Sequence, residues 1–233
     1  SRKNKFKDIS FQLKKGEVLG IAGMLGSGRT ELLKSIFGAD PLDGGEIFIE
    51  GQKIQKHTLK EMMRHGLALT PEDRKTEGLI LEQTIYNNLC YANLDNIKKH
   101  GFVQEKKAVE MVKQQVERLQ IKVASVQQPV NSLSGGNQQK VVVGNWLNTQ
   151  PKIIMFDEPS RGIDVKAKQQ IFQIMWEQSR LGIASIMVSS ELEELLEVCQ
   201  RILIMRDGVI QQEVYPEDVK IDDLYALCMG GEK

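Results

Sequence analysis

The chain has 233 residues, 41% of them hydrophobic, which is enough for one large domain or two small ones with a core that needs no disulfide support. Its 31 basic and 31 acidic residues cancel, so no overall field favours nucleic acid or an anionic membrane surface as a partner. No apolar run approaches the roughly 20 residues of a membrane span and the N-terminus lacks a signal-peptide pattern, so we expect any work at a membrane to be done from its cytoplasmic side.

Mixed sheet is predicted for the first part of the chain. Residues 6–13 alternate polar and apolar side chains, which predicts a half-buried strand, and the apolar run at 17–22 predicts a better buried one. A glycine-rich turn follows, and after it residues 31–37 predict a helix. Residues 46–54 predict a hairpin, so the opening combines antiparallel strands with a strand-turn-helix unit.

A helical insert is predicted over residues 86–125, where the composition becomes charged. Four apolar residues recur there at helical spacing along one stripe: Val109, Val112, Val116 and Leu119. Apolar strands at 152–156 and 183–188 flank a helix predicted over 165–180, a pattern that a parallel sheet covered on both faces requires. A hairpin over 201–211 and a tail helix complete an α/β fold.

Three cysteines, Cys90, Cys199 and Cys228, stand far apart and form no CxxC pair. This spacing indicates a reducing compartment and argues against a zinc site. We expect each of them to be a buried or incidental thiol.

A glycine-rich loop joins the second predicted strand to the following helix and fits the phosphate-loop pattern GxxxxGK[ST] at every position except the lysine. Its eight residues are Gly23, Met24, Leu25, Gly26, Ser27, Gly28, Arg29 and Thr30. The glycines allow consecutive backbone N–H groups to face one anion, and the helix that follows adds the positive end of its dipole. The loop therefore predicts a polyphosphate site, with the Thr30 hydroxyl as a ligand of Mg²⁺. The alternative is a glycine-rich turn that holds no ligand.

Arginine at position 29 is the one departure from this pattern. Lysine acts here as a compact point charge near the outer phosphates, whereas the planar guanidinium of Arg29 prefers to grip two oxygens side by side. We therefore expect phosphate binding to survive while catalysis weakens.

Two acids follow the apolar strand predicted at 152–156. Asp157 and Glu158 stand at its carboxyl end, where open α/β sheets bind ligands. Asp157 is predicted to hold the Mg²⁺ shell. Glu158 is predicted to orient or deprotonate the water that attacks a γ-phosphate, because phosphoryl transfer depends mostly on positioning and charge neutralisation. Alone, the pair also fits a solvated strand end, and the upstream glycine-rich loop is what favours the catalytic interpretation.

The string LSGGNQQK at residues 133–140 is the most specific in the chain, and we refer to it as the signature segment. A serine hydroxyl and glycine N–H groups at the start of a helix present donors suited to phosphate. The alternative is a helix cap that contains glycines. The glycine-rich loop, the signature segment and the Asp-Glu pair follow one another in this order. In this order they resemble the ATPase domain of ATP-binding cassette proteins, and the resemblance covers essentially the whole chain.

This resemblance implies a P-loop NTPase (RecA-like) core with an N-terminal antiparallel β subdomain and an inserted α-helical subdomain. We expect one nucleotide-binding domain over 1–233, with its core in 1–85 and 141–233 and its helical subdomain in 86–140. In this family two such domains pair head to tail around ATP and Mg²⁺, so each chain supplies half of each site.

The resemblance also assigns roles to residues. The loop at 23–30 is expected to hold one ATP, which the partner's signature segment covers. The residues expected to serve ATP bound to the partner are Ser134, Gly135, Gly136 and Gln138. Asp164, in the segment that follows the Asp-Glu pair, is expected at the dimer seam.

Two further positions depart from the family pattern. The glutamine that normally contacts Mg²⁺ and the membrane subunit corresponds to Glu72, which can still bind the metal and the nucleotide but adds negative charge beside ATP. The switch histidine that senses the γ-phosphate in catalysis corresponds to Ser190. Serine can hydrogen-bond but is too short and too weakly basic to replace imidazole.

Taken together, the strings GRTE, PEDRK, LSGGNQQK and SSELEE resemble the C-terminal ATPase half of the tandem subunit of bacterial monosaccharide importers of the ribose, galactose and arabinose type. This implies a fused N-terminal partner half, which would also explain a chain that starts without methionine. It further implies membrane permease subunits and, indirectly, a periplasmic or extracellular sugar-binding protein. We expect a peripheral protein on the cytoplasmic face of a bacterial plasma membrane, with no nucleic-acid partner.

Three functions remain open from the sequence. The first is a sugar-importer ATPase half whose own loop site is degenerate and whose signature segment serves the partner's ATP. The second is a non-transport cassette ATPase that acts on ribosomes or DNA, against which the neutral charge and the lack of a basic arm speak. The third is a purely regulatory nucleotide-binding half without hydrolysis.

Overall fold

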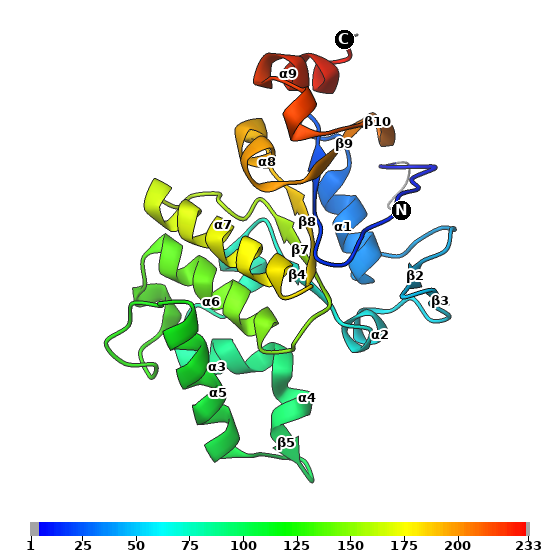
Figure 1. The fold of residues 1–233 in the computed structure, drawn as a ribbon. Coiled ribbons are helices and arrows are strands. Elements are labelled where there is room, and N and C mark those ends of the chain that lie inside the picture. The colour runs from blue at the N-terminus through cyan, green and yellow to red at the C-terminus, as the bar shows by residue number, and fades with distance from the viewer. Residues whose placement is uncertain (1–4, 232–233) are drawn as a thin grey trace. The chain divides into compact units, whose positions relative to one another are not determined.

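The computed structural model describes residues 5–231, and its largest element is a six-stranded sheet (Figure 1). The strands lie in the order β10-β9-β1-β8-β7-β4. Their bounds are Val18–Ala22 (β1), Leu67–Thr70 (β4), Ile153–Asp157 (β7), Ala184–Val188 (β8), Arg201–Arg206 (β9) and Val209–Val214 (β10). Strand β1 is parallel to β8 and β9, β7 is parallel to β8, and β10 closes one edge antiparallel to β9.

The register of the parallel strands brings their carboxyl ends to one edge of the sheet. Ile21 of β1 and Asp157 of β7 both pair with Val188 of β8. Every residue of β1 and β8 is buried, because their apolar runs are covered on both faces. The segments that leave β1, β7 and β8 therefore start side by side.

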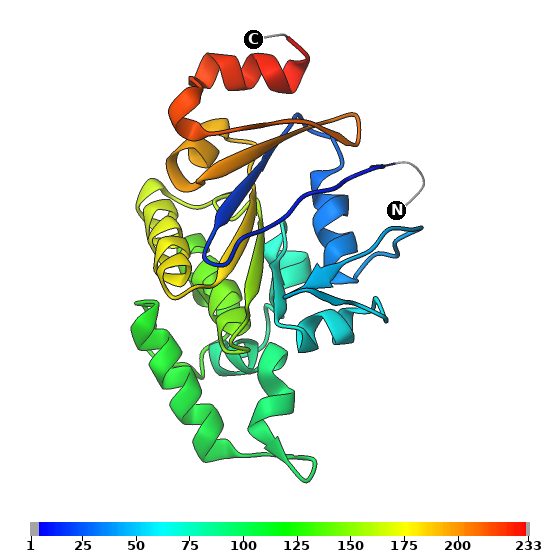
Figure 2. The ribbon, with the colours of Figure 1, turned by 45° about the vertical axis from the view of Figure 1, so that its right-hand side comes forward.

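The described chain divides into two compact units. The first consists of the described residues up to Leu69, residues 152–158 and the described chain from Met175 on. Its helices are α1 (Arg29–Phe37), α2 (Leu59–Arg64), α8 (Leu192–Val198) and α9 (Ile221–Met229), with a short turn at Pro216–Asp218. Strands β2 (Phe48–Ile49) and β3 (Gln52–Lys53) form a separate antiparallel hairpin. Figure 1 and Figure 2 show α1 on one face of the sheet and α8 on the other.

The second unit is helical and comprises Thr70–Pro151 and Pro159–Ile174. Its helices are α3 (Ile85–Cys90), α4 (Leu94–Ile97), α5 (Glu105–Arg118) and α6 (Gly135–Leu147), with short helical turns at Arg74–Gly78, Tyr91–Asn93 and Val130–Ser132. Strands β5 (Lys98–Lys99) and β6 (Phe102–Val103) form a small hairpin. Helix α7 (Val165–Arg180) starts in this unit and ends in the first. Of the predicted apolar stripe, Val112 and Leu119 are buried, whereas Val109 is 48% exposed.

Most of the predicted elements are confirmed. The strands expected at 17–22, 152–156 and 183–188 are β1, β7 and β8, and the helix expected at 165–180 is α7. The two predicted hairpins are β2–β3 and β9–β10. The predicted boundaries of the helical subdomain stay a prediction. Among the described residues, no helix combines the length and the apolar character needed to cross a bilayer.

The strand predicted at 6–13 is wrong, because the structure leaves this segment without strand assignment. A strand needs a ladder of backbone hydrogen bonds with a neighbour. The N–H of Lys7 donates to the carbonyl of Gly208 at 2.9 Å, but within the described part of the chain no further rung follows along this segment. Alternating polarity alone therefore did not identify a strand here.

The three cysteines are free and buried, as the sequence predicted. Burial raises the pKa of the Cys90 thiol to about 11, and burial, with a smaller effect of the Glu17 charge, raises the pKa of Cys199. Because a neutral buried thiol is a poor nucleophile, we expect none of the three to react with DTNB at about pH 8 in the folded protein and all to react in denaturant. Rapid labelling of a thiol before unfolding would contradict this packing.

Candidate functional site

The loop between β1 and α1 turns through two left-handed backbone positions. Gly26 has a φ of 83° and Gly28 a φ of 96°, values that residues with a Cβ rarely adopt. A Cβ at Gly28 would also lie 2.4 Å from the carbonyl oxygen of Lys5, so space as well as conformation requires glycine there. No side chain caps α1 at Gly28, and an uncapped helix start is suited to an anion.

The side chain of Ser27 adds a hydroxyl to this helix start. Ser27 is 7% exposed, and its hydroxyl has no hydrogen-bond partner among the described residues. Leaving a buried hydroxyl without a hydrogen bond costs about 1–3 kcal/mol. A phosphate oxygen at the loop would accept a hydrogen bond from Ser27 and so remove this cost. Met24 and Leu25 lie on the outside of the loop, with Leu25 94% exposed. The donors of this loop therefore fit a polyphosphate.

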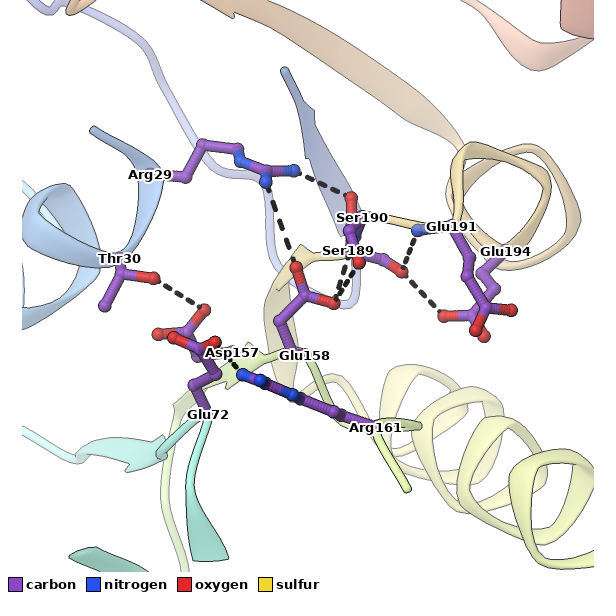
Figure 3. A network of polar contacts seen from close by, with 10 residues as sticks. All are labelled: Arg29, Thr30, Glu72, Asp157, Glu158, Arg161, Ser189, Ser190, Glu191 and Glu194. Atoms are coloured by element: carbon purple, nitrogen blue, oxygen red, sulfur yellow. Dashed lines mark hydrogen bonds and ion pairs between the residues drawn. The ribbon is translucent and has the colours of Figure 1, made fainter. Parts of the chain in front are cut away.

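A hydroxyl and a carboxylate meet beside the loop. Thr30 Oγ1 donates a hydrogen bond to Asp157 Oδ1 at 3.1 Å (Figure 3), and Asp157 is fully buried at the end of β7. Oxygen ligands of this kind suit Mg²⁺, which takes its other ligands from phosphates and water. The described residues contain no cluster of three or more His, Cys, Asp or Glu side chains that could hold a metal without such additional ligands.

The ends of β7 and β8 are joined through Glu158. The backbone N–H and the hydroxyl of Ser190 both donate to Glu158 Oε2, each at 3.0 Å (Figure 3). The backbone of Glu158 has a φ of 48°, a left-handed conformation that costs about 1–3 kcal/mol for a non-glycine residue. Its N–H donates to the carbonyl of Val188 at 2.9 Å. The structure thus brings together the two residues that the sequence proposed as catalytic.

Arg29 completes this group of contacts. Its Nη1 donates to the carbonyl oxygen of Ser189 at 2.8 Å, and its Nη2 lies 3.9 Å from Glu158 Oε1 (Figure 3). From the sequence we expected this side chain to contact phosphate, and neither the Ser189 carbonyl nor the Glu158 carboxylate was predicted as its partner. The guanidinium is buried, so these contacts are shielded from water.

Two further residues support the same strand end and were not predicted. The hydroxyl of Ser189 donates to Glu194 Oε2 at 2.7 Å and accepts from the N–H of Glu191 at 3.1 Å. Ser189 and Glu194 are both buried, and the two hydrogen bonds of Ser189 hold the turn from β8 into α8. The acidic string after the two serines was the only signal in the sequence.

The second unit holds Glu72 in an ion pair with Arg161 (Figure 3). Arg74 donates from the same segment to the carbonyl oxygens of Arg161 at 2.6 Å and Gly162 at 3.1 Å. The segment that contains Glu72 is therefore tied to the segment that precedes α7. The predicted role of Glu72 as a metal ligand stays a prediction.

The signature segment starts α6, with Ser134 as the N-cap residue. A Cβ at Gly135 would lie 2.9 Å from the carbonyl oxygen of Gly162. A Cβ at Gly136 would lie 2.4 Å from the Cβ of Ala167. Gly135 is therefore required by close packing against the segment before α7, and Gly136 by close packing against the first turn of α7, whatever they contribute to a nucleotide.

Gln138 and Asp164 have partners within their own segments. Gln138 is buried and donates from Nε2 to the carbonyl of Leu133 at 3.1 Å. Asp164 Oδ1 accepts from the N–H of Ala167 at 2.9 Å and so stabilises the start of α7. Their proposed roles in a shared nucleotide site stay predictions.

Comparison with protein families settles the classification. A family model described as ABC transporter matches residues 6–161. The chain belongs to the ABC transporter family. The family resemblance expected from the glycine-rich loop, the signature segment and the Asp-Glu pair is confirmed.

Curated ABC proteins similar to the chain include two ribose import ATP-binding proteins RbsA. That of Oceanobacillus iheyensis is 42% identical over 231 residues, which cover 99% of this chain and 47% of the relative. That of Bacillus subtilis is 41% identical over the same share of each chain. The chain therefore spans about half the length of the curated relatives that it matches.

Solved ATP-binding cassettes share its fold. A dimeric cassette in a post-hydrolysis state bound to ADP and Pi is 22% identical, with a TM-score of 0.78 over 91% of this chain and 90% of that one. A nucleotide-free cassette from an ABC transporter is 24% identical, with a TM-score of 0.79 over 95% and 89%. The predicted α/β class with a P-loop NTPase core is thus confirmed.

Proposed function

We propose that the chain binds Mg-ATP at the loop between β1 and α1 and takes part in its hydrolysis, and that this reaction energises sugar import through a membrane permease. The observation that carries the proposal is the Thr30 hydroxyl bonded to the buried Asp157 carboxylate, beside an uncapped helix start. Similarity along the whole chain to ribose import ATP-binding proteins supports the sugar class. The proposed location is the cytoplasmic face of a bacterial plasma membrane.

Each residue of the site has a separate task in this proposal. Thr30 and Asp157 would hold Mg²⁺, which neutralises phosphate charge, and Glu72 is a further candidate ligand. Glu158 would orient the attacking water and accept its proton at a carboxylate oxygen. Ser190 donates to that carboxylate and fixes its position, but it cannot take up a proton near neutral pH as histidine can. Slow turnover in this chain's own site is the expected consequence.

The signature segment is proposed to serve ATP bound to a second cassette. Ser134, Gly135 and Gly136 lie at the start of α6, where the N-cap residue Ser134 makes no side-chain cap hydrogen bond, so this helix start is again suited to an anion. The second cassette is proposed to be the other half of a longer subunit, which the half-length match to the relatives supports. In that arrangement a permease and an external sugar-binding protein complete the importer.

Restoring lysine at position 29 is expected to raise the turnover of this chain's own site less than about tenfold, because Ser190 and Glu72 still depart from the family pattern. Phosphate release by Arg29→Lys would be compared with wild type and with the triple variant Arg29→Lys, Ser190→His, Glu72→Gln. We expect only the triple variant to gain substantially. A single variant as fast as the triple one would contradict this account of the three departures.

Partner capture tests the transport part of the proposal. The tagged protein would be mixed separately with detergent-solubilised sugar permease, with ribosomes and with DNA, in the presence of Mg-ATP. Retention of the permease alone is expected. Retention of ribosomes or DNA without the permease would instead support a cassette ATPase outside transport.

A purely regulatory nucleotide module is a second candidate, favoured by one observation: both carboxylate oxygens of Glu158 lie near donors in the chain. The test is ATP turnover by the complete transporter with Glu158→Gln. A fall in rate is expected if this carboxylate contributes to hydrolysis. An unchanged rate would establish the regulatory alternative.

A further inference from the structure

Arg29 begins α1, but its side chain is directed at the ends of two strands (Figure 3). One guanidinium nitrogen donates to the Ser189 carbonyl after β8, and another lies 3.9 Å from the Glu158 carboxylate after β7. The side chains of Arg29 and Glu158 are 6% and 11% exposed, so water and salt screen this ion pair weakly. The cation therefore acts on the carboxylate at short range.

Glu158 is also held from a second direction. Ser190 donates twice to its other carboxylate oxygen, at 3.0 Å in each case. The left-handed backbone of Glu158 persists because its neighbours hold it, and strained positions of this kind cluster at functional sites. The carboxylate is thus oriented by Arg29 on one side and by Ser190 on the other.

Arginine is suited to this arrangement in a way that lysine is not. A guanidinium is planar and carries five donors, so different edges can serve a carbonyl and a carboxylate together. An ammonium is a compact point charge on a flexible stem and cannot bridge them with the same geometry. The charge of Arg29 also acts on Cys228 of α9. Burial holds the pKa of this thiol above its ordinary value, and the charge of Arg29 makes that rise smaller.

We propose that Arg29 is a positioning residue for Glu158 and not the principal cation for the outer phosphates. It neutralises the carboxylate and ties it to the end of β8, while the loop backbone, Ser27 and Thr30 carry phosphate binding. This inference rests on the proposed nucleotide site. It accounts for a loop that retains its phosphate donors although its characteristic lysine is replaced.

Nucleotide affinity in a double-mutant cycle tests the inference. The proteins are wild type, Arg29→Gln, Glu158→Gln and the double variant, titrated with Mg-ADP and with Mg-AMPPNP, which is not hydrolysed. We expect Arg29→Gln to change either affinity less than about threefold, and Glu158→Gln to tighten binding about tenfold because the released guanidinium reaches phosphate. That gain is expected to disappear in the double variant.

The opposite pattern would overturn the inference. In that pattern Arg29→Gln lowers the nucleotide affinity about a hundredfold, and Glu158→Gln has the same effect with arginine or glutamine at position 29. Arg29 would then be an ordinary phosphate contact. Arg64→Gln controls for the loss of one positive charge, because Arg64 is an exposed arginine of α2. If Arg29→Gln fails to fold, Arg29→Lys replaces it in the cycle, with the same expected loss of coupling to Glu158. Absence of nucleotide binding by the wild type would instead overturn the proposed function, together with the inference that rests on it.

Discussion

Replacing Gly136 by alanine is expected to destabilise the protein by about 2–3 kcal/mol, as overpacking does in a dense core. The new Cβ would lie 2.4 Å from the Cβ of Ala167, well inside the carbon contact distance of about 3.5–4.0 Å. A Cβ cannot rotate away, so the starts of α6 and α7 must separate. The free energy of unfolding, measured by urea denaturation, would report the change.

Two control variants separate this contact from general effects of the substitution. Gly44→Ala introduces the same methyl group at a position where, apart from the two chain neighbours, no heavy atom of the described residues lies within 4 Å. We expect it to change stability less than about 0.5 kcal/mol. Adding Ala167→Gly to Gly136→Ala restores the space, and we expect it to recover the loss except for about 1 kcal/mol from glycine in a helix. A double variant less stable than Gly136→Ala alone would show that this contact is not the cause.

The second large effect is expected at Asp157. Asparagine there keeps the shape and the hydrogen bond from Thr30 but removes the charge that a magnesium site needs. We expect Asp157→Asn to reduce the gain in ATP affinity that Mg²⁺ provides by about a hundredfold, which corresponds to about 2.7 kcal/mol. Titrations of ATP with Mg²⁺ and with EDTA would measure this gain.

A matched control for Asp157→Asn is Asp207→Asn. The Asp207 side chain is 90% exposed, and its left-handed backbone suits asparagine equally well. The control should leave the effect of Mg²⁺ unchanged. An Asp157→Asn variant that responds to Mg²⁺ as the wild type does would remove this carboxylate from the metal site.

The ends of the central strands could be predicted from the sequence because two strong signals coincide there. Apolar runs identify buried parallel strands, and the glycine-rich loop and the Asp-Glu pair follow those runs directly. Thr30 and Asp157 were both expected to bind Mg²⁺, which requires their side chains to lie close together. In the structure the Thr30 hydroxyl donates a hydrogen bond to the Asp157 carboxylate.

The partners of long polar side chains could not be predicted in the same way. Arg29 and Glu72 were matched to family positions, but a side chain with several rotatable bonds takes the partner that tertiary structure offers. Arg29 meets Ser189 and Glu158, and Glu72 meets Arg161, each across more than 80 residues of chain. The strand expected at 6–13 was wrong for a related reason, since a strand exists only where a neighbour completes its ladder.

Mg-ATP binding and phosphate release, measured side by side on one sample of the monomeric protein, test whether the chain holds a nucleotide that it hydrolyses only slowly. We expect one nucleotide bound per chain, with turnover below about 0.1 s⁻¹, under the typical enzyme range of about 1–1,000 s⁻¹. Turnover within that range by the monomer would contradict a site weakened at Arg29, Glu72 and Ser190. Failure to bind Mg-ATP at all would contradict the nucleotide site itself.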